Sequence, residues 1–256
     1  TSIATVTVYL VPFMAIFYII GAFVVIFNHL DAVPAAISMA FQGAFGDPRA
    51  LPGALAGWAV KSAITRGIAR GVFSNEAGLG SAPMVHCTAR VDHPVRQGLY
   101  GIFEVFMDTL VICTLTATAI LTTGVLTSQP ELTGAQLSLS AFSMTLGGAG
   151  TMILSLGLSL FAFSTILGWY WYGETALVYL CGCQAMIKPF KIVWITLVVL
   201  GGWGGAEILT NLWDLSDTLN GLMAIPNLVG LLLLTKELRR LTADFDAKLK
   251  SGELRK

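Results

Sequence analysis

Residues 71–84 read GVFSNEAGLGSAPM, and the predicted fold is arranged around this stretch. It lies inside a segment of membrane-spanning length, yet it contains three glycines, a proline and the polar run Ser74, Asn75 and Glu76. A lipid-facing helix does not carry such a run in its middle, because each backbone N–H and C=O in hydrocarbon must be satisfied. Secondary transporters use broken helices to present helix ends and free carbonyls to substrates and ions. We therefore expect a helix broken near 73–81 with a transport site beside it.

The composition is that of an all-α polytopic membrane protein. Hydrophobic residues make up 55% of the chain and charged residues only 12%, whereas about a quarter of a soluble domain is charged; the mean hydropathy is +0.75. The formal net charge is zero, so the charge balance gives no indication of a nucleic-acid partner. The four cysteines lack the C-x-x-C spacing of metal sites, and neither zinc nor a disulfide framework is indicated.

Apolar stretches long enough to cross about 30 Å of hydrocarbon predict about six transmembrane helices, one of them discontinuous. The predicted spans cover about 5–28, 58–88, 98–126, 140–172, 189–206 and 214–236. They form a transmembrane domain over 1–240, followed by a cytoplasmic tail over 241–256. Between the spans, 31–58 is expected to hold re-entrant or surface helices, and 174–187 a surface helix.

The basic residues predict the orientation of these spans. With six alternating spans, the opposite loops contain only Arg49, and one side collects the basic residues after 235 together with Arg90, Arg96, Lys188 and Lys191. Because positive loops stay in the cytoplasm, we expect a multi-pass protein of the plasma (inner) membrane with both chain ends cytoplasmic. The chain enters a span at once, without the charged n-region of a signal peptide, so we interpret it as a fragment of a longer transporter.

Enzyme motifs are not found. The run 78–83, GLGSAP, lacks the third glycine of a dinucleotide loop and the Lys-Ser/Thr of a Walker loop. The sequence also lacks H-E-x-x-H and G-x-S-x-G. We therefore expect a protein that is not an enzyme.

The charged side chains near the break have two interpretations. In the structural one, Glu76 pairs with a basic residue such as Arg70, and Asn75 caps the helix where it resumes. In the functional one, Asn75 and Glu76 lie at or just behind a ligand cavity, since a buried polar cluster is costly unless it is used. Glu104 and Asp108 lie one turn apart and could couple protons, but they are close to a charged turn. A gating or structural role is thus favoured for Arg70, Glu76 and Asp108.

A second group of candidate site residues lies in the fourth predicted span and consists of Ser164, Thr165 and Trp169. Ser and Thr hydroxyls in membrane helices usually bond back to a carbonyl of the preceding turn. The alternative is that two adjacent hydroxyls and a backbone carbonyl serve as hard oxygen ligands for sodium. Thr165 and Trp169 lie one turn apart, on one face of the helix.

Several ordered motifs resemble the alanine or glycine:cation symporter family, the sodium:alanine symporters. They are GIARGVFSNEAGLGSAP (67–83), HPVRQG (93–98), VFMDT (105–109), FSTILGW (163–169) and YGE (172–174). The resemblance implies a leucine-transporter-type inverted-repeat fold, built of two five-helix repeats of opposite topology. The six spans would then be the family's fifth to tenth helices, which is the second repeat plus one preceding helix.

The resemblance also implies site residues and partners. A sodium site would use the Phe161 carbonyl, Ser164 and Thr165, and sodium would be co-transported. The substrate, a small neutral amino acid such as alanine or glycine, would contact the unwound and the eighth helix through Phe73, Ser74, Asn75, Gly78, Thr165 and Trp169. The remaining partners would be the lipid bilayer and the missing N-terminal helices of the same transporter, without which the chain is not expected to transport.

Three functions follow as hypotheses. The first is sodium-coupled symport of small neutral amino acids by alternating access, with this chain as a fragment of the transporter. The second keeps the fold but couples transport to protons, with Glu76 or Asp108 as the proton carrier. The third is a membrane scaffold that does not transport.

Overall fold

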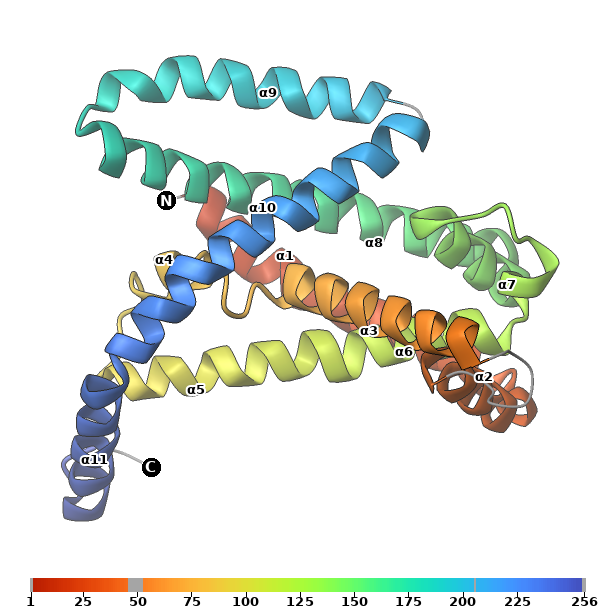
Figure 1. Ribbon diagram of the computed structural model, residues 1–256, viewed down its shortest axis with the longest axis horizontal. Coiled ribbons are helices and arrows are strands. Elements are labelled where there is room, and N and C mark those ends of the chain that lie inside the picture. The colour runs from red at the N-terminus through yellow and green to blue at the C-terminus, as the bar shows by residue number, and fades with distance from the viewer. Residues whose placement is uncertain (1, 46–52, 205, 255–256) are drawn as a thin grey trace. The chain divides into compact units, whose positions relative to one another are not determined.

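The computed structural model describes residues 2–45, 53–204 and 206–254. Every regular element in these ranges is a helix (Figure 1). The chain divides into two compact units: Thr1–Arg66 with Val111–Trp194, and Gly67–Leu110 with Ile195–Lys256. Three helical elements continue from one unit into the other, namely α3 (Gly53–Asn75), the π-helix η2 (Phe106–Ile112) and α9 (Ile187–Trp203).

The first unit packs around three long helices, α1 (Ser2–Phe27), α6 (Cys113–Thr122) and α8 (Gly134–Cys181). Two small residues, Ala22 and Ala119, are fully buried at their contacts, which allows close approach of the helix backbones. The hydroxyls of Tyr18 and Thr116 share a hydrogen bond between α1 and α6. The buried core consists of Tyr18, Ala22, Val25, Leu115, Ala119, Phe142 and Leu154.

Helix α8 is kinked at Gly147, whose φ of 60° and ψ of −144° lie in a region that only glycine adopts readily. Beyond the kink the chain passes so close to the preceding turns that a Cβ at Gly150 would lie 2.5 Å from the Phe142 carbonyl oxygen. The kink therefore lets one chain segment supply two packed helices of different direction.

The end of α8 corrects the sequence prediction of a separate surface helix over 174–187. The helix instead continues to Cys181 and ends where Gly182 adopts a φ of 62°. The residues after Gly173 include helix formers such as Glu, Ala and Leu and no proline before Pro189, so nothing interrupts the hydrogen-bond ladder. Tyr170 stacks on Phe190 at the start of α9, with ring centroids 5.7 Å apart.

Shorter elements complete the first unit. They are the 3-10 helix η1 (Leu30–Ala32), α2 (Val33–Phe45), α7 (Val125–Ser128) and the 3-10 helix η3 (Gln184–Met186). The chain bends by 80° between the end of α1 and the segment η1–α2. Of the predicted re-entrant or surface region 31–58, α2 forms one helix, 46–52 lies outside the described residues, and α3 begins at Gly53.

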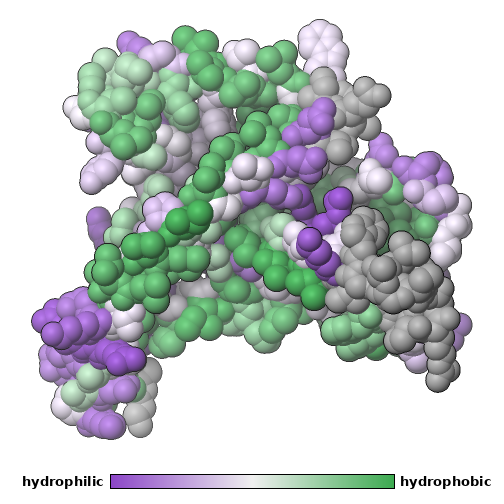
Figure 2. Space-filling model, viewed as in Figure 1, coloured by the Kyte–Doolittle hydropathy of each residue, from purple (hydrophilic) through white to green (hydrophobic). Residues whose placement is uncertain are grey.

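The second unit contains the end of α3 and the helices α4 (Ala82–His86), α5 (Pro94–Val105), α10 (Ala206–Leu233) and α11 (Thr235–Ser251). Helix α5 runs into η2 without a break. Helices α10 and α11 meet at a 58° bend. Figure 2 shows a hydrophobic surface at the end of α10, where Leu231–Leu234 are exposed, which gives way to a hydrophilic surface over α11.

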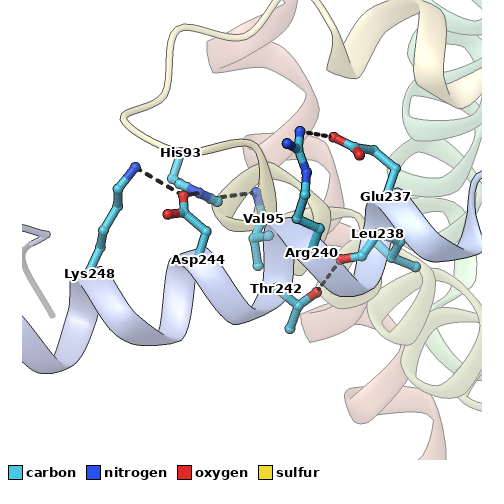
Figure 3. Close-up of polar contacts among 8 residues, drawn as sticks. All are labelled: His93, Val95, Glu237, Leu238, Arg240, Thr242, Asp244 and Lys248. Atoms are coloured by element: carbon cyan, nitrogen blue, oxygen red, sulfur yellow. Dashed lines mark hydrogen bonds and ion pairs between the residues drawn. The ribbon is translucent and has the colours of Figure 1, made fainter.

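A buried histidine docks α11 onto the start of α5 (Figure 3). His93 is 4% exposed; its Nδ1 accepts a hydrogen bond from the Val95 amide and so caps α5. Its Nε2 lies 3.1 Å from Oδ2 of Asp244, which also pairs with Lys248 at 2.9 Å. The ring of buried Phe245 packs on the His93 ring, with centroids 5.1 Å apart.

The lengths and composition of the helices are those of a membrane protein. Among the described residues, Pro94–Thr122, Gly134–Cys181 and Gln184–Trp203 are each long and apolar enough to cross a bilayer. Two bent pairs, Val11–Phe27 with Leu30–Phe45 and Asn211–Leu233 with Thr235–Ser251, raise the number to five if each pair is one span. The six-span topology and its orientation stay predictions.

Replacing Gly147 by alanine should destabilise the protein, because a Cβ is strained at this backbone conformation. We expect a loss of about 1–3 kcal/mol, measured as a lower melting temperature in detergent. Gly148→Ala is the matched control, since a Cβ there meets no atom within 4 Å and its φ is not positive. Equal melting temperatures for the two variants would contradict the assigned strain.

The docking of α11 should weaken in acid. Lys248 first and His93 second hold the pKa of Asp244 below its ordinary value of 3.8, so the ionised form stabilises the docked helix above that pH and the stabilisation is lost as pH falls through the lowered pKa. A nitroxide at Ser251→Cys should become more mobile as pH falls from about 5 to about 2. Asp244→Asn should be mobile at both values, whereas Asp246→Asn should behave like the parent.

Candidate functional site

Helix α3 ends at Asn75 and the chain resumes as α4 at Ala82, so the interruption falls inside the stretch from which the sequence predicts a break. Gly78 and Gly80 both have a φ of 87°, and Glu76 has a φ of 55°. Glycine adopts such values at no steric cost, which explains why the turn is glycine-rich. The side chain of Asn75 accepts a hydrogen bond from the Ala77 amide at 2.9 Å and closes the first turn of the loop.

The start of the break is fixed to η2 by two side-chain hydrogen bonds. The Ser74 hydroxyl donates to Oδ2 of Asp108 at 2.7 Å, and the Asn75 amide donates to the Thr109 hydroxyl at 3.0 Å. Both acceptors lie in η2, and π-helical turns often occur at functional sites. The widened turn therefore presents a carboxylate and a hydroxyl to the end of α3.

The middle of the break is held by Asn227 of α10, whose amide donates to the Gly78 carbonyl at 2.9 Å. A Cβ at Gly80 would lie 3.1 Å from Oδ1 of the same asparagine, so Gly80 is needed for this close approach as well as for its φ. The sequence analysis missed Asn227. The available signal is an amide side chain directly after Pro226, within the apolar second half of α10.

Two structural interpretations of the charged residues need correction. Arg70 does not pair with Glu76; its ion pair is with Asp217 of α10, at 2.5 Å. Glu76 instead accepts a hydrogen bond from the Ser81 hydroxyl at 2.7 Å, which closes the loop on itself. Asn75 does not cap the resumed helix, because the residue at the N-terminal cap of α4 is Ser81.

The predicted aromatic residue of the break, Phe73, is half-buried and meets the edge of Trp213 with ring centroids 5.2 Å apart. The Arg70 guanidinium lies 4.4 Å above the same indole ring. Trp213 therefore contacts two consecutive turns of α3 just before the break.

The other predicted site residues lie on α8, in the first unit. The Ser164 hydroxyl donates to the Phe161 carbonyl at 2.9 Å, which is the local bond expected of a membrane serine and also brings two predicted sodium ligands together. Thr165 is exposed. Trp169 meets the ring of Tyr172 at 5.7 Å. The structure thus groups the predicted residues as two sets, one at the break and one on α8, each in its own unit.

Apart from the carboxylates of Glu76 and Asp108 at the break, the polar groups of both sets are uncharged. Within the described ranges, no cluster of three or more His, Cys, Asp or Glu side chains could hold a metal ion. Backbone carbonyls and hydroxyls, which occur at the break and at Phe161 and Ser164, are ligands for hard alkali cations and partners for amino and carboxylate groups. The arrangement is suited to reversible binding of ions and small solutes.

Long apolar helices, and one helix interrupted at an internally bonded polar loop, define a polytopic membrane protein of the transporter class. The chain belongs to the sodium:alanine symporter family, whose profile matches residues 1–256. It is 43% identical to an uncharacterized transporter of Haemophilus influenzae over 97% of this chain and 53% of that protein.

Two further relatives carry more specific names. The chain is 43% identical to the sodium/alanine symporter AgcS of Methanococcus maripaludis, over 91% of this chain and 50% of that protein. It is 36% identical to the probable sodium/glutamine symporter GlnT of Bacillus subtilis, over 95% of this chain and 49% of that protein. The chain therefore spans about half the length of the curated relatives it matches.

Gly80→Ala should disrupt the break. A non-glycine residue at this φ is strained by about 1–2 kcal/mol, and its Cβ would displace Asn227 from the loop. We expect a lower melting temperature than in Gly71→Ala, where a helical Cβ meets no atom within 4 Å. A Gly80→Ala protein that melts like Gly71→Ala would show that the close contact with Asn227 is dispensable.

Proposed function

We propose that this chain is part of a sodium-coupled symporter that carries small neutral amino acids, alanine or glycine, by alternating access. The observation that carries the proposal is the helix interrupted between Asn75 and Ala82 in a member of the sodium:alanine symporter family. The relative named as a sodium/alanine symporter supports both the ion and the substrate. Another relative is named for glutamine.

The proposed architecture is the leucine-transporter type, in which this chain supplies the second five-helix repeat and the helix before it. The broken helix α3–α4 would be the sixth helix of the whole transporter and α8 the eighth. The helices before this chain would complete the first repeat, and transport requires them.

The proposed sodium ligands are the Phe161 carbonyl, the Ser164 hydroxyl and the Thr165 hydroxyl. The first two oxygens lie 2.9 Å apart, so an ion that contacts both needs only a rotation of the Ser164 hydroxyl proton. The Thr165 hydroxyl makes no side-chain hydrogen bond to other residues that the structure describes. Its oxygen is therefore available to an ion.

The proposed substrate contacts at the break are Phe73, Ser74, Asn75 and Gly78, with Thr165 and Trp169 from α8. Two aromatic side chains would keep the pocket small, which suits alanine or glycine. Sodium would favour the conformation that binds substrate, and the same factor would apply in reverse, so substrate must tighten sodium binding equally.

Proton coupling is the second candidate, and one observation favours it. Asp108 is a carboxylate in a π-helical turn that accepts a hydrogen bond directly from Ser74 at the break. A proton taken up there would turn one carboxyl oxygen into a donor, leave a weaker acceptor and so loosen the bond from Ser74. Glu76, bonded to Ser81, is the alternative carrier.

The decisive experiment measures uptake of labelled alanine into proteoliposomes by the complete transporter that contains this chain. We expect uptake to require sodium and to fall about tenfold or more in Thr165→Ala, which is the effect of losing about 1.4 kcal/mol of binding free energy. Thr151→Ala, at an exposed threonine of the same helix, is the matched control. Uptake that follows a pH gradient, ignores sodium and fails in Asp108→Asn would replace the sodium assignment by the proton-coupled one.

A further inference from the structure

One histidine joins the resumed half of the broken helix to α5. His86 is the last residue of α4, and its ring reaches three residues of α5, namely Gln97, Gly101 and Glu104. These three are spaced four and three residues apart, so they share one face of α5. The contact lies outside the predicted substrate and sodium contacts.

The neighbours of the His86 ring determine where its proton lies. Nε2 of Gln97 lies 2.8 Å from Nδ1 of His86. Because an amide nitrogen can only donate, Nδ1 is the acceptor and carries no proton. Nε2 of the ring lies 3.3 Å from Oε2 of Glu104. A lone pair there would face a carboxylate, so the ring proton is on Nε2, on the side of Glu104. The neutral ring therefore accepts from one residue of α5 and presents its N–H to another.

The ring is also packed against α5. A Cβ at Gly101 would lie 3.7 Å from Nε2 of His86, which is ordinary van der Waals contact, so the ring lies directly on the backbone of α5. The side chain of His86 is 26% exposed, whereas that of Glu104 is 70% exposed. Within the described part of the chain, α4 packs on α5, and Glu104 is the charged group that α5 presents to the ring. Both ring nitrogens are therefore held by α5.

The same helix also holds the other half of the broken helix. Helix α5 runs into η2, where Asp108 and Thr109 bond the end of α3. Gln97 and Asp108 are eleven residues apart, which is about 16 Å along a helix. One continuous helix thus contacts the chain on both sides of the break. The separation of the two halves, and with it the geometry of the backbone groups between them, depends on both contacts.

We propose that His86 is a positioning residue for substrate binding, whose Nε2–H tautomer, selected by Gln97 and Glu104, fixes the resumed half of the broken helix on α5. The residue does not touch the substrate. It acts through the backbone groups of the break, whose positions follow from those of the two helix halves. This inference rests on the proposed function, because it concerns the affinity of that same substrate site.

The experiment reverses the polarity of this network. Gln97→Glu replaces the donor to Nδ1 by a second carboxylate, and a ring with one proton then leaves one carboxylate facing a lone pair. We expect the KM for sodium-dependent alanine uptake by the complete transporter to rise about tenfold at neutral pH. The ratio of variant to parent KM should fall again at about pH 5.5, where a histidine between two carboxylates takes up a second proton. Gln136→Glu, at an exposed glutamine of α8, is the control for the added charge.

The double variant Gln97→Glu with Glu104→Gln should restore the parent KM at neutral pH. The ring then donates from Nδ1 to the carboxylate and accepts at Nε2 from the amide, which mirrors the native arrangement. Glu104→Gln alone keeps an acceptor for the Nε2–H, so it should raise the KM by a smaller factor than Gln97→Glu. Side chains that merely filled space would give neither the recovery in acid nor the rescue by exchange.

The outcomes separate this inference from the proposed function. An unchanged KM in Gln97→Glu, or a double variant no better than the single one, would overturn the positioning role while leaving alanine transport intact. If the parent elutes as a single species but takes up no alanine with sodium, the proposed function itself is overturned. Melting temperatures then test the network, because they should fall in Gln97→Glu and recover in the double variant. The same recovery is expected if Gln97→Glu alone is too unstable for uptake to be measured.

Discussion

The structure depends on which groups form hydrogen bonds to the backbone N–H and C=O groups that are freed where the helix is broken. Unwinding a helix in a membrane frees N–H and C=O groups that lipid cannot bond. Here the loop supplies part of the answer, since the Asn75 side chain accepts from the Ala77 amide and the Glu76 carbonyl accepts from the Leu79 amide. A further bond comes from α10, whose Asn227 side chain donates to the Gly78 carbonyl. The break is therefore a hydrogen-bonded structure in its own right.

Charged side chains near the break also have polar partners. Arg70 would be costly to bury alone, but Asp217 neutralises it and Trp213 covers its face. Asp108 accepts a hydrogen bond from the Ser74 hydroxyl. Arg70, Glu76 and Asp108 thus each have a specific polar partner. A transporter needs such a balance, because its substrate and ion alter it on each cycle.

The sequence predicted the break, which is set by neighbouring residues, and missed the contacts between residues that are far apart in the chain. Glycines, a proline and a polar run mark the break directly, since turn conformations depend on the residues that adopt them. The partners could not be found that way: Arg70 and Asp217 are 147 residues apart, and Gly78 and Asn227 are 149 apart. Pairing Arg70 with nearby Glu76 was the natural local choice and was wrong. The sodium and substrate residues stay predictions, because no ligand defines them.

Helix α10 connects the two sides of the site. Asp217 meets α3 before the break, and Asn227 meets the loop within it; the ten residues between them span about 15 Å of helix. Pro226 lies directly before Asn227, and a proline inside a helix removes one backbone hydrogen bond and favours a bend. A bend at this position alters the Asn227 contact relative to the Asp217 contact. The amide that holds the Gly78 carbonyl therefore lies just after the proline, whereas the ion pair lies more than two turns before it.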